Sequence, residues 1–251
     1  AGPLDSVRTD ARGRYAFRYR PSGAGDALYF ASTSYGGIAY FSPPFRDAAV
    51  RDEAAEIQVF DTTSSGRALT ARGRHLVVGA PDPNGVRRVI EVWELENDTS
   101  VTLVPAAGSP RGVWSAPIPA GARGVALRPN SDIPPDDFRA VNGRATLLAP
   151  FAPGLRQVAY QYELADAAFP LRVAVESPIT VLEILVEEPQ GTATGARFAQ
   201  GDPVQLEGRS FRRFLAQDVA ANAPVAVSIP DPPSTTSRWI LPAAVLAVGG
   251  G

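Results

Sequence analysis

Few of the residue types that carry enzyme chemistry occur in this chain of 251 residues. There is no cysteine and only one histidine, His75, so thiolate nucleophiles, cysteine-bound zinc and sites built from two imidazoles are excluded. All 24 basic residues are arginine, so a phosphate-binding loop ending in Gly-Lys is impossible. No serine stands in a Gly-x-Ser-x-Gly elbow. We therefore predict a protein that is not an enzyme and binds no cofactor.

The remaining titratable residues do not form a pattern that indicates catalysis or metal binding. His75 follows Arg72-Gly73-Arg74 and opens a predicted strand, where a lone histidine is structural or exposed more often than catalytic. Asp132, Asp136 and Asp137 share one loop whose oxygens could bind Ca²⁺, but the spacing differs from an EF-hand and two prolines stiffen it. We interpret it as a solvated loop and predict no metal site. The other acidic pairs are interpreted as strand-edge charges: Glu94 and Glu96, Glu187 and Glu188.

Five aromatic residues gather in one short stretch near the N-terminus, beside Gly36-Gly37 and Pro43-Pro44: Tyr29, Tyr35, Tyr40, Phe41 and Phe45. About three of the five are expected to fill a sandwich core, and the others to form a protein-contact patch, because tyrosine and phenylalanine supply large contact areas at low entropic cost. An exposed, coplanar set with polar neighbours would instead indicate sugar binding. The contact candidates are Tyr35, Tyr40, Phe41 and Phe45.

The spacing of turn residues along the chain predicts an all-β fold. Proline and glycine, 24 and 23 residues, are spread along the sequence, and turn signals fall every 8 to 15 residues. Between them lie apolar or alternating runs typical of strands, without a convincing helix before residue 238. The clearest predicted strands are 75–80, 86–96, 100–104, 112–116, 124–127, 144–148, 156–163, 171–175 and 180–186.

The N-terminal region carries a recognisable hairpin pattern. A strand ending in Thr9-Asp10 is followed by a short turn with Gly13 and by a strand in which Tyr15, Phe17 and Tyr19 alternate with other residues. This pattern, together with 35–41 and Pro43-Pro44-Phe45, resembles the carboxypeptidase regulatory-like domains, which are transthyretin-like β-sandwiches of bacterial envelope proteins. The resemblance implies an envelope location and no peptidase activity, since these modules carry no zinc ligands. The family's first strands are missing upstream of Ala1, so we expect the natural chain to begin earlier.

These patterns divide the chain into successive regions. We predict tandem β-sandwich modules, the first transthyretin-like and the second immunoglobulin-like, followed by the start of a transmembrane helix. The predicted ranges are 1–62, the regulatory-like domain; 70–189, the immunoglobulin-like sandwich; 190–230, a small β region; 231–238, a stiff linker; and 239–251, the start of a membrane anchor.

The last 13 residues are uncharged and largely apolar. A spanning helix needs about 20 apolar residues, so this stretch is either the first half of a membrane helix or a C-terminal strand or tail. An interfacial tryptophan after a proline-rich linker favours the anchor. The anchor candidates are Trp239, Ile240, Leu241, Val245 and Leu246.

Taken together, the sequence predicts a non-catalytic, periplasmic protein anchored to the inner membrane. Its expected role is that of an accessory or scaffolding subunit of a membrane complex, such as a respiratory or photosynthetic one, acting through contacts with other protein subunits. A net charge of −2 argues against nucleic acid as the partner. The alternative is a carbohydrate- or cell-wall-binding module, and a peptidase or esterase fragment is the least favoured hypothesis.

Overall fold

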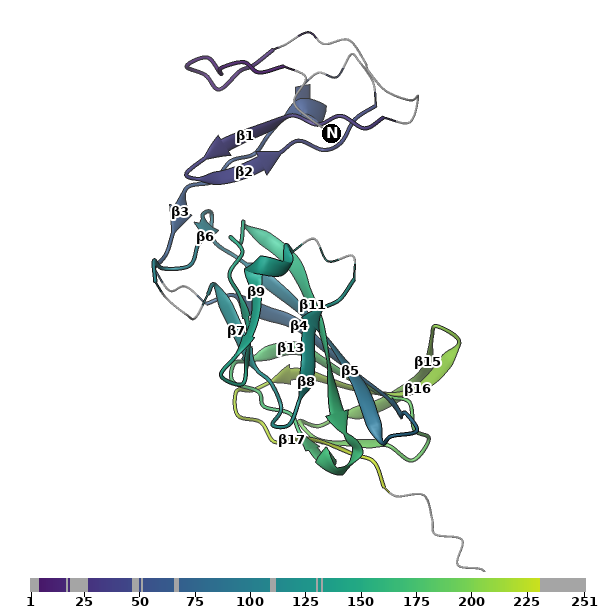
Figure 1. The fold of residues 1–251 in the computed structure, drawn as a ribbon. Helices are drawn as coiled ribbons and strands as arrows, with labels where there is room; N and C mark the ends of the chain where they lie inside the picture. The colour runs from purple at the N-terminus through teal and green to yellow at the C-terminus, as the bar shows by residue number, and fades with distance from the viewer. Residues whose placement is uncertain are drawn as a thin grey trace, which may run out of the picture.

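The computed structural model describes residues 5–16, 18, 27–46, 50, 52–65, 68–108, 112–129, 131 and 133–230. Within them the fold is nearly all β: strands make up 51% and no helix reaches seven residues. The three helical segments are single 3₁₀ turns: η1 (Asp52–Ala55), η2 (Pro135–Asp137) and η3 (Asp166–Ala168). The predicted all-β class is confirmed, and several sheets stack in a manner consistent with a β-sandwich (Figure 1).

One layer is a seven-stranded sheet in the order β15-β16-β13-β4-β5-β11-β8. All neighbours are antiparallel except β13 and β4, which run parallel. Alternation places Arg74, Leu76 and Val78 of β4 and the odd-numbered positions of β5 inside. The bounds are β4 (Thr70–Pro81), β5 (Val86–Asn97), β8 (Arg123–Leu127), β11 (Gly154–Ala165), β13 (Ile179–Val186), β15 (Ala199–Leu206) and β16 (Arg209–Val219).

Two three-stranded sheets pack against the seven-stranded sheet. Their orders are β7-β10-β9 and β12-β17-β14. Trp93 of β5 meets Trp114 of β7 edge to face, with ring centroids 5.2 Å apart, and Phe138 of β9 meets Tyr160 of β11 at 5.5 Å. A single contiguous apolar core joins the layers. The bounds are β7 (Trp114–Pro117), β9 (Phe138–Val141), β10 (Arg144–Leu147), β12 (Leu171–Arg172), β14 (Thr192–Gly195) and β17 (Val225–Ser228).

The N-terminal part is a hairpin of β1 (Ser32–Tyr35) and β2 (Ile38–Phe41). Gly36 and Gly37 form its two-residue turn with φ of +57° and +81°, values that favour glycine at both positions. A parallel bridge between β3 (Thr62–Thr63) and β6 (Thr102–Leu103) ties this part to the sandwich. Figure 1 shows β1 and β2 at one end of the molecule, with β2 nearer the sandwich.

Several elements differ from the sequence-based expectations. The strand with His75 begins at Thr70, and a bulge between Ala71 and Gly73 shifts the alternation so that both Ala71 and Arg74 are buried. No strand is assigned over 5–16, although the predicted turn forms through the Gly13 N–H bond to the Asp10 carbonyl, at 2.9 Å. Residues 56–61 form no regular strand.

Residues 190–230, expected as a small β region of their own, supply β14 to β17. Strand β16 lies between β15 and β13 and so extends the large sheet, while β14 and β17 join β12 in a smaller one. Strand β15 is interrupted by a bulge between Gly201 and Val204. Pro203 lies in this bulge, on an edge strand where the loss of an N–H is tolerated.

Candidate functional site

The predicted contact residues occupy three different environments. Phe41 is 58% exposed, and its ring meets the ring of Phe30 edge to face at 5.4 Å. Leu28 and Phe30, two residues apart, are 56% and 55% exposed. We call Leu28, Phe30 and Phe41 the aromatic patch. Leu28 and Phe30 were not among the predicted contact residues, although their alternation with half-buried Tyr29 and buried Ala31 signalled an outward face.

The other three candidates lie outside this patch. Tyr35 is exposed, and its hydroxyl donates to Asp61 at 2.7 Å; this bond raises the pKa of the phenol. Phe45 is half-buried and stacks on Tyr29, with ring centroids 6.4 Å apart. Tyr40 is buried, and its hydroxyl lies 3.1 Å from the Phe60 carbonyl and 3.0 Å from Thr102 Oγ1. Tyr40 therefore fastens the hairpin to the sandwich.

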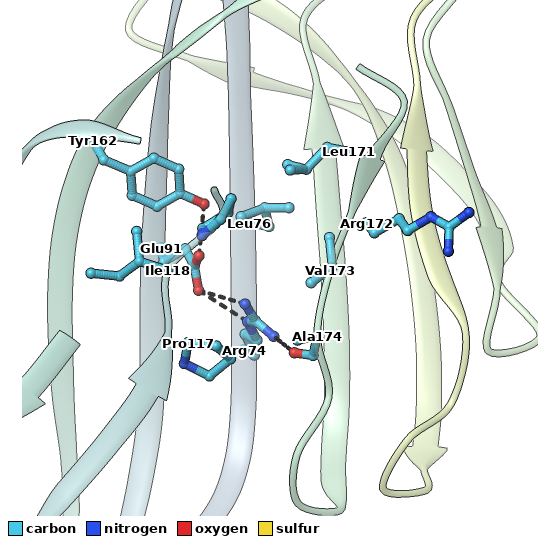
Figure 2. Close-up of a pocket in the computed structure, with 11 residues that line it drawn as sticks. Arg74, Leu76, Glu91, Pro117, Ile118, Tyr162, Leu171, Arg172, Val173 and Ala174 are labelled. Atoms are coloured by element: carbon cyan, nitrogen blue, oxygen red, sulfur yellow. Dashed lines mark hydrogen bonds and ion pairs between the residues drawn. The ribbon is translucent and has the colours of Figure 1, made fainter. Parts of the chain in front are cut away.

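A buried charge network crosses the sandwich beside a small cavity (Figure 2). Arg74 of β4 and Glu91 of β5 are fully enclosed, and Nε and Nη2 of Arg74 lie 3.0 and 2.9 Å from Glu91 Oε2. The Tyr162 hydroxyl donates to Glu91 Oε1 at 2.8 Å, and Trp93 Nε1 and the Tyr160 hydroxyl donate to Oε2, both at 3.2 Å. Glu91 thus accepts hydrogen bonds from four side chains.

Further contacts stabilise the buried positive charge of Arg74. Its Nη1 donates to the Ala174 carbonyl at 2.6 Å, and its guanidinium lies 4.5 Å from the Trp93 ring centroid. Burial alone lowers the pKa of Arg74, but the Glu91 charge reverses this effect and the net direction is upward. Burial first, and then Glu91, raise the pKa of Tyr160 and Tyr162 well above the ordinary value, which keeps both hydroxyls protonated as donors.

The cavity beside this network measures about 40 Å³ and is lined by Arg74, Glu91, Tyr162 and Arg172 and by apolar residues such as Leu171. This volume suits one or two water molecules and not an organic substrate. The network therefore has the character of a structural element that fixes the register of the strands around it.

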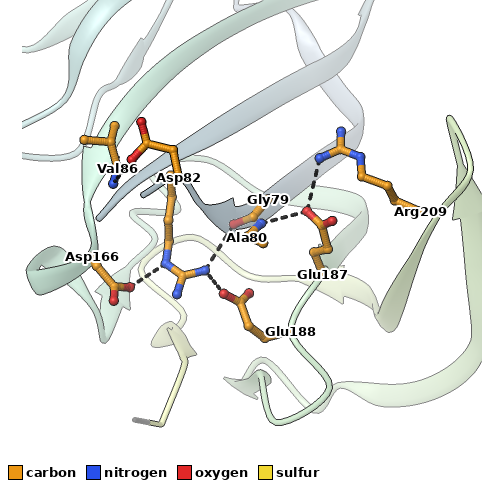
Figure 3. Close-up of polar contacts among 9 residues, drawn as sticks. Gly79, Ala80, Asp82, Val86, Asp166, Glu187, Glu188 and Arg209 are labelled. Atoms are coloured by element: carbon orange, nitrogen blue, oxygen red, sulfur yellow. Dashed lines mark hydrogen bonds and ion pairs between the residues drawn. The ribbon is translucent and has the colours of Figure 1, made fainter. Parts of the chain in front are cut away.

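A second charge cluster lies near one end of the same strands (Figure 3). Arg87 of β5 is buried; its Nε lies 2.5 Å from Asp166 Oδ1, and its Nη1 donates to Glu188 Oε1 and, at 3.1 Å, to the Gly79 carbonyl. Next to it, Glu187 Oε2 accepts from the Ala80 N–H at 2.7 Å and from Arg209 at 3.2 Å. Glu187 and Glu188, expected as plain strand-edge charges, link β13 to β4, β5 and β16.

His75 lies on the outer face of the large sheet. Its Nδ1 is 2.7 Å from Glu183 Oε2, its Nε2 is 3.8 Å from Glu94 Oε1, and Arg213 Nε donates to Glu183 Oε1 at 2.6 Å. The hydrogen bond to Glu183 raises the pKa of His75, and the same bond lowers the pKa of Glu183. Histidine, carboxylate and guanidinium thus form a surface ion-pair group with no nucleophile beside it in the part of the chain described.

This group predicts a pH dependence of stability. Since the folded pKa of His75 is raised above 6.5, its contribution is complete below pH 6.5 and is lost as the pH rises through the folded pKa. The Glu183 contribution is present above about pH 4.5 and is lost as the pH falls. The melting temperature of the wild type should therefore exceed that of His75→Gln most between about pH 5 and 6.5, and least near pH 9. A difference that grows with pH would contradict the assignment.

The predicted acidic loop and membrane anchor are only partly described. Asp136 and Asp137 belong to η2, whereas Asp132 lies outside the described residues. Over the described ranges, no group of three or more histidine or acidic side chains is arranged to hold a metal ion.

The anchor candidates also lie outside the described residues: Trp239, Ile240, Leu241, Val245 and Leu246. Among residues 5–230, as far as they are described, no helix has the length and apolar character to cross a bilayer.

Comparison of the chain with protein-family models and with curated proteins finds no match. The candidate site therefore rests on geometry alone. The aromatic patch is the candidate binding surface. Covering exposed apolar side chains that touch one another removes apolar area from water, which favours binding of a partner.

Proposed function

We propose that this chain is a non-catalytic accessory or scaffolding subunit of a membrane protein complex on the periplasmic side of a bacterial inner membrane. It acts through protein–protein contacts, and the aromatic patch of Leu28, Phe30 and Phe41 is its contact surface. The segment 239–251 begins its membrane anchor. In this proposal the N-terminal region is a transthyretin-like module and residues 70–189 form an immunoglobulin-like sandwich.

The observation that carries the proposal is the exposed patch on a hairpin that is fastened to the sandwich. Three apolar side chains are each more than half exposed: Phe41 on β2, and Leu28 and Phe30 in the segment before β1. Tyr40, which precedes Phe41 on β2, is bonded to Thr102 of the sandwich. A fixed aromatic surface loses little conformational entropy on binding. Phenylalanine is enriched at the centre of protein interfaces, which supports a protein partner.

The geometry of the rings favours protein over sugar as the partner. The Phe30 and Phe41 rings are inclined by 72°, so they offer no common flat face to a pyranose ring. The third exposed residue of the patch, Leu28, is aliphatic. The Tyr29 and Phe45 rings are closer to parallel, at 28°, but both are half-buried.

The proposal predicts position-specific cross-linking. With a photoreactive phenylalanine at position 41, the chain expressed in cells that carry the native gene should cross-link to one discrete protein. The same probe at Val141, which is 47% exposed on β9, is the matched control and should give no such product. Phe30→Ser should reduce the product at position 41 about tenfold, as expected for a residue at the centre of an interface.

Identical products at positions 41 and 141, or no product at position 41, would contradict the proposal. Binding of the purified chain to isolated peptidoglycan that Phe30→Ser abolishes would replace it with the carbohydrate-binding alternative.

A further inference from the structure

The aromatic patch and the last described strand lie at opposite ends of the molecule. Figure 1 shows β1 and β2 beyond one end of the sandwich and β17 at the other. Strand β5, which is 12 residues long, runs between these ends. At its last residue, Asn97 Nδ2 donates to the Val101 and Phe151 carbonyls at 2.8 and 3.0 Å. Thr102, which follows Val101, meets Tyr40 of the hairpin, so the Asn97 end of β5 is the end that carries the patch.

The chain leaves the sandwich at the opposite end of β5. The Arg87 guanidinium, near the start of the strand, lies 5.4 Å from the Phe169 ring centroid. Two residues after Phe169, Leu171 of β12 pairs with Val227 of β17. Strand β17 ends at Ser228, two residues before the end of the described structure. The part of the chain that follows residue 230 is therefore attached at the Arg87 end, away from the patch.

The sandwich between the two ends is a rigid spacer. At about 3.3 Å per residue, β5 rises about 33 Å from Arg87 to Asn97. It pairs with β4 on one side and β11 on the other, and each of these strands is also 12 residues long. The hairpin is fastened at its end by the buried Tyr40 hydroxyl and by the parallel bridge between β3 and β6. The patch is therefore kept on the order of 30 Å from the point where the chain leaves the sandwich.

This separation limits what the patch can reach. In the proposed function the bilayer lies on the side of residues 239–251, and the hydrocarbon core of a bilayer is itself only about 30 Å thick. With the long axis of the sandwich pointing away from the bilayer, the patch lies outside the lipid and beyond the membrane-spanning helices of a partner. The net charge of −2 provides no attraction to anionic headgroups that would draw the sandwich flat onto the membrane.

We propose that the aromatic patch binds an extramembrane domain of the partner subunit, at a height above the bilayer that the sandwich sets. The bound surface is apolar where it meets the Phe30 and Phe41 rings and polar around them, as at the centre and rim of other protein interfaces. This inference rests on the proposed contact function and anchor, and it adds which part of the partner is contacted.

Cross-linking followed by mass spectrometry identifies the contacted part. The full-length natural protein carries a photoreactive phenylalanine at position 41 or at position 84, and native membranes are irradiated. Asn84 is the matched control, because it is exposed in the turn before β5, at the end where the chain leaves the sandwich. The peptide cross-linked to position 41 should come from a partner segment outside its membrane-spanning helices. Position 84 should give no product with that segment.

Energy transfer to the bilayer measures the height of the patch. These 251 residues contain no cysteine, so a donor dye on Ser34→Cys or on Asn84→Cys marks one end of the molecule. Both positions are exposed, Ser34 on β1 and Asn84 at the opposite end. Each variant of the full-length natural protein is reconstituted into phosphatidylethanolamine–phosphatidylglycerol vesicles that contain an acceptor-labelled lipid. Transfer should be several-fold stronger from position 84 than from position 34.

Equal transfer from positions 34 and 84 would overturn the inference, because the sandwich would then lie flat on the membrane. Stronger transfer from position 34 that Phe30→Ser reduces would also overturn it, since the patch would then insert into lipid. A product at position 41 that maps to a membrane-spanning helix of the partner would overturn the inference and leave the contact function standing. The absence of any product at position 41 would instead remove the proposed function, and the inference with it.

Discussion

Replacing Arg74 with methionine is expected to destabilise the sandwich by about 3–5 kcal/mol, the cost of removing one partner of a buried ion pair. Methionine fits the volume of the arginine stem but leaves the Glu91 carboxylate enclosed without its cation. A domain of this kind has a total stability of about 5–15 kcal/mol, so the loss is a large fraction of it. Urea unfolding followed by tryptophan fluorescence should show a lower midpoint with an unchanged slope.

Arg72→Met is the matched control for this prediction. Arg72 lies on the same strand β4 and pairs with Glu96 of the same strand β5, but its side chain is 48% exposed. An exposed pair contributes about 0–1 kcal/mol, so the midpoint should barely move. Equal losses in the two variants would show that the Arg74–Glu91 pair has no special role.

The network also predicts how a double replacement behaves. Removing Glu91 together with Arg74 leaves the Tyr160 and Tyr162 hydroxyls in the core without the carboxylate that accepts from them, whereas the Trp93 N–H keeps the Tyr160 oxygen as an acceptor at 3.3 Å. Each unsatisfied buried donor costs about 1–3 kcal/mol. Arg74→Met/Glu91→Leu is therefore expected to be no more stable than Arg74→Met, unlike buried pairs that stand alone.

The strands of the sandwich could be predicted from the sequence, because turn residues and apolar runs mark them locally. The run 86–96 became β5, and the run 180–186 became most of β13. The direction in which β5 faces was harder to predict, because both of its faces carry apolar residues. The inward side holds Val89, Glu91 and Trp93, whereas Ile90 and Val92 face outward and are only half-buried.

The buried network could not be predicted, because a charged residue at a core position breaks the alternation on which strand prediction rests. The two charges are not directly opposite each other: Arg74 is opposite Trp93, and Glu91 is opposite Leu76. Only a register fixed by the whole sheet places them as diagonal neighbours. Pairings between distant segments, such as the parallel pair β4 and β13, likewise leave no local signal in the sequence.

The aromatic cluster was visible in the sequence, but its division into core and surface was not. Tyr40 and Phe41 are adjacent residues of one strand, and alternation sends the first into the junction and the second into solvent. Which of the two faces outward depends on the sandwich residue Thr102, 62 positions along the chain. A pattern confined to residues 29–45 contains no information about that partner.

Ending the chain after Pro230 is expected to move the protein from the membrane fraction to the soluble fraction while leaving it folded. The last described strand, β17, ends at Ser228, and its inward residues Val225 and Val227 are buried in the core. Strand β17 therefore contributes to the core from within the retained residues. If 239–251 begins an anchor, its removal abolishes membrane attachment, because that segment supplies the apolar length.

Two measurements on the shortened chain separate the outcomes. Carbonate extraction of membranes should retain the full-length natural protein and release the shortened one. The near-ultraviolet circular dichroism of the shortened chain should show fixed aromatic packing, since Trp93, Trp114 and Tyr160 all lie within the retained residues. A shortened chain that unfolds would show that 231–251 complete the core as a strand, and one that stays in the membrane would place the attachment elsewhere. Ending the chain within β17, after Ala226, is the contrasting variant: it removes buried Val227 and should unfold the sandwich even though it also lacks the anchor.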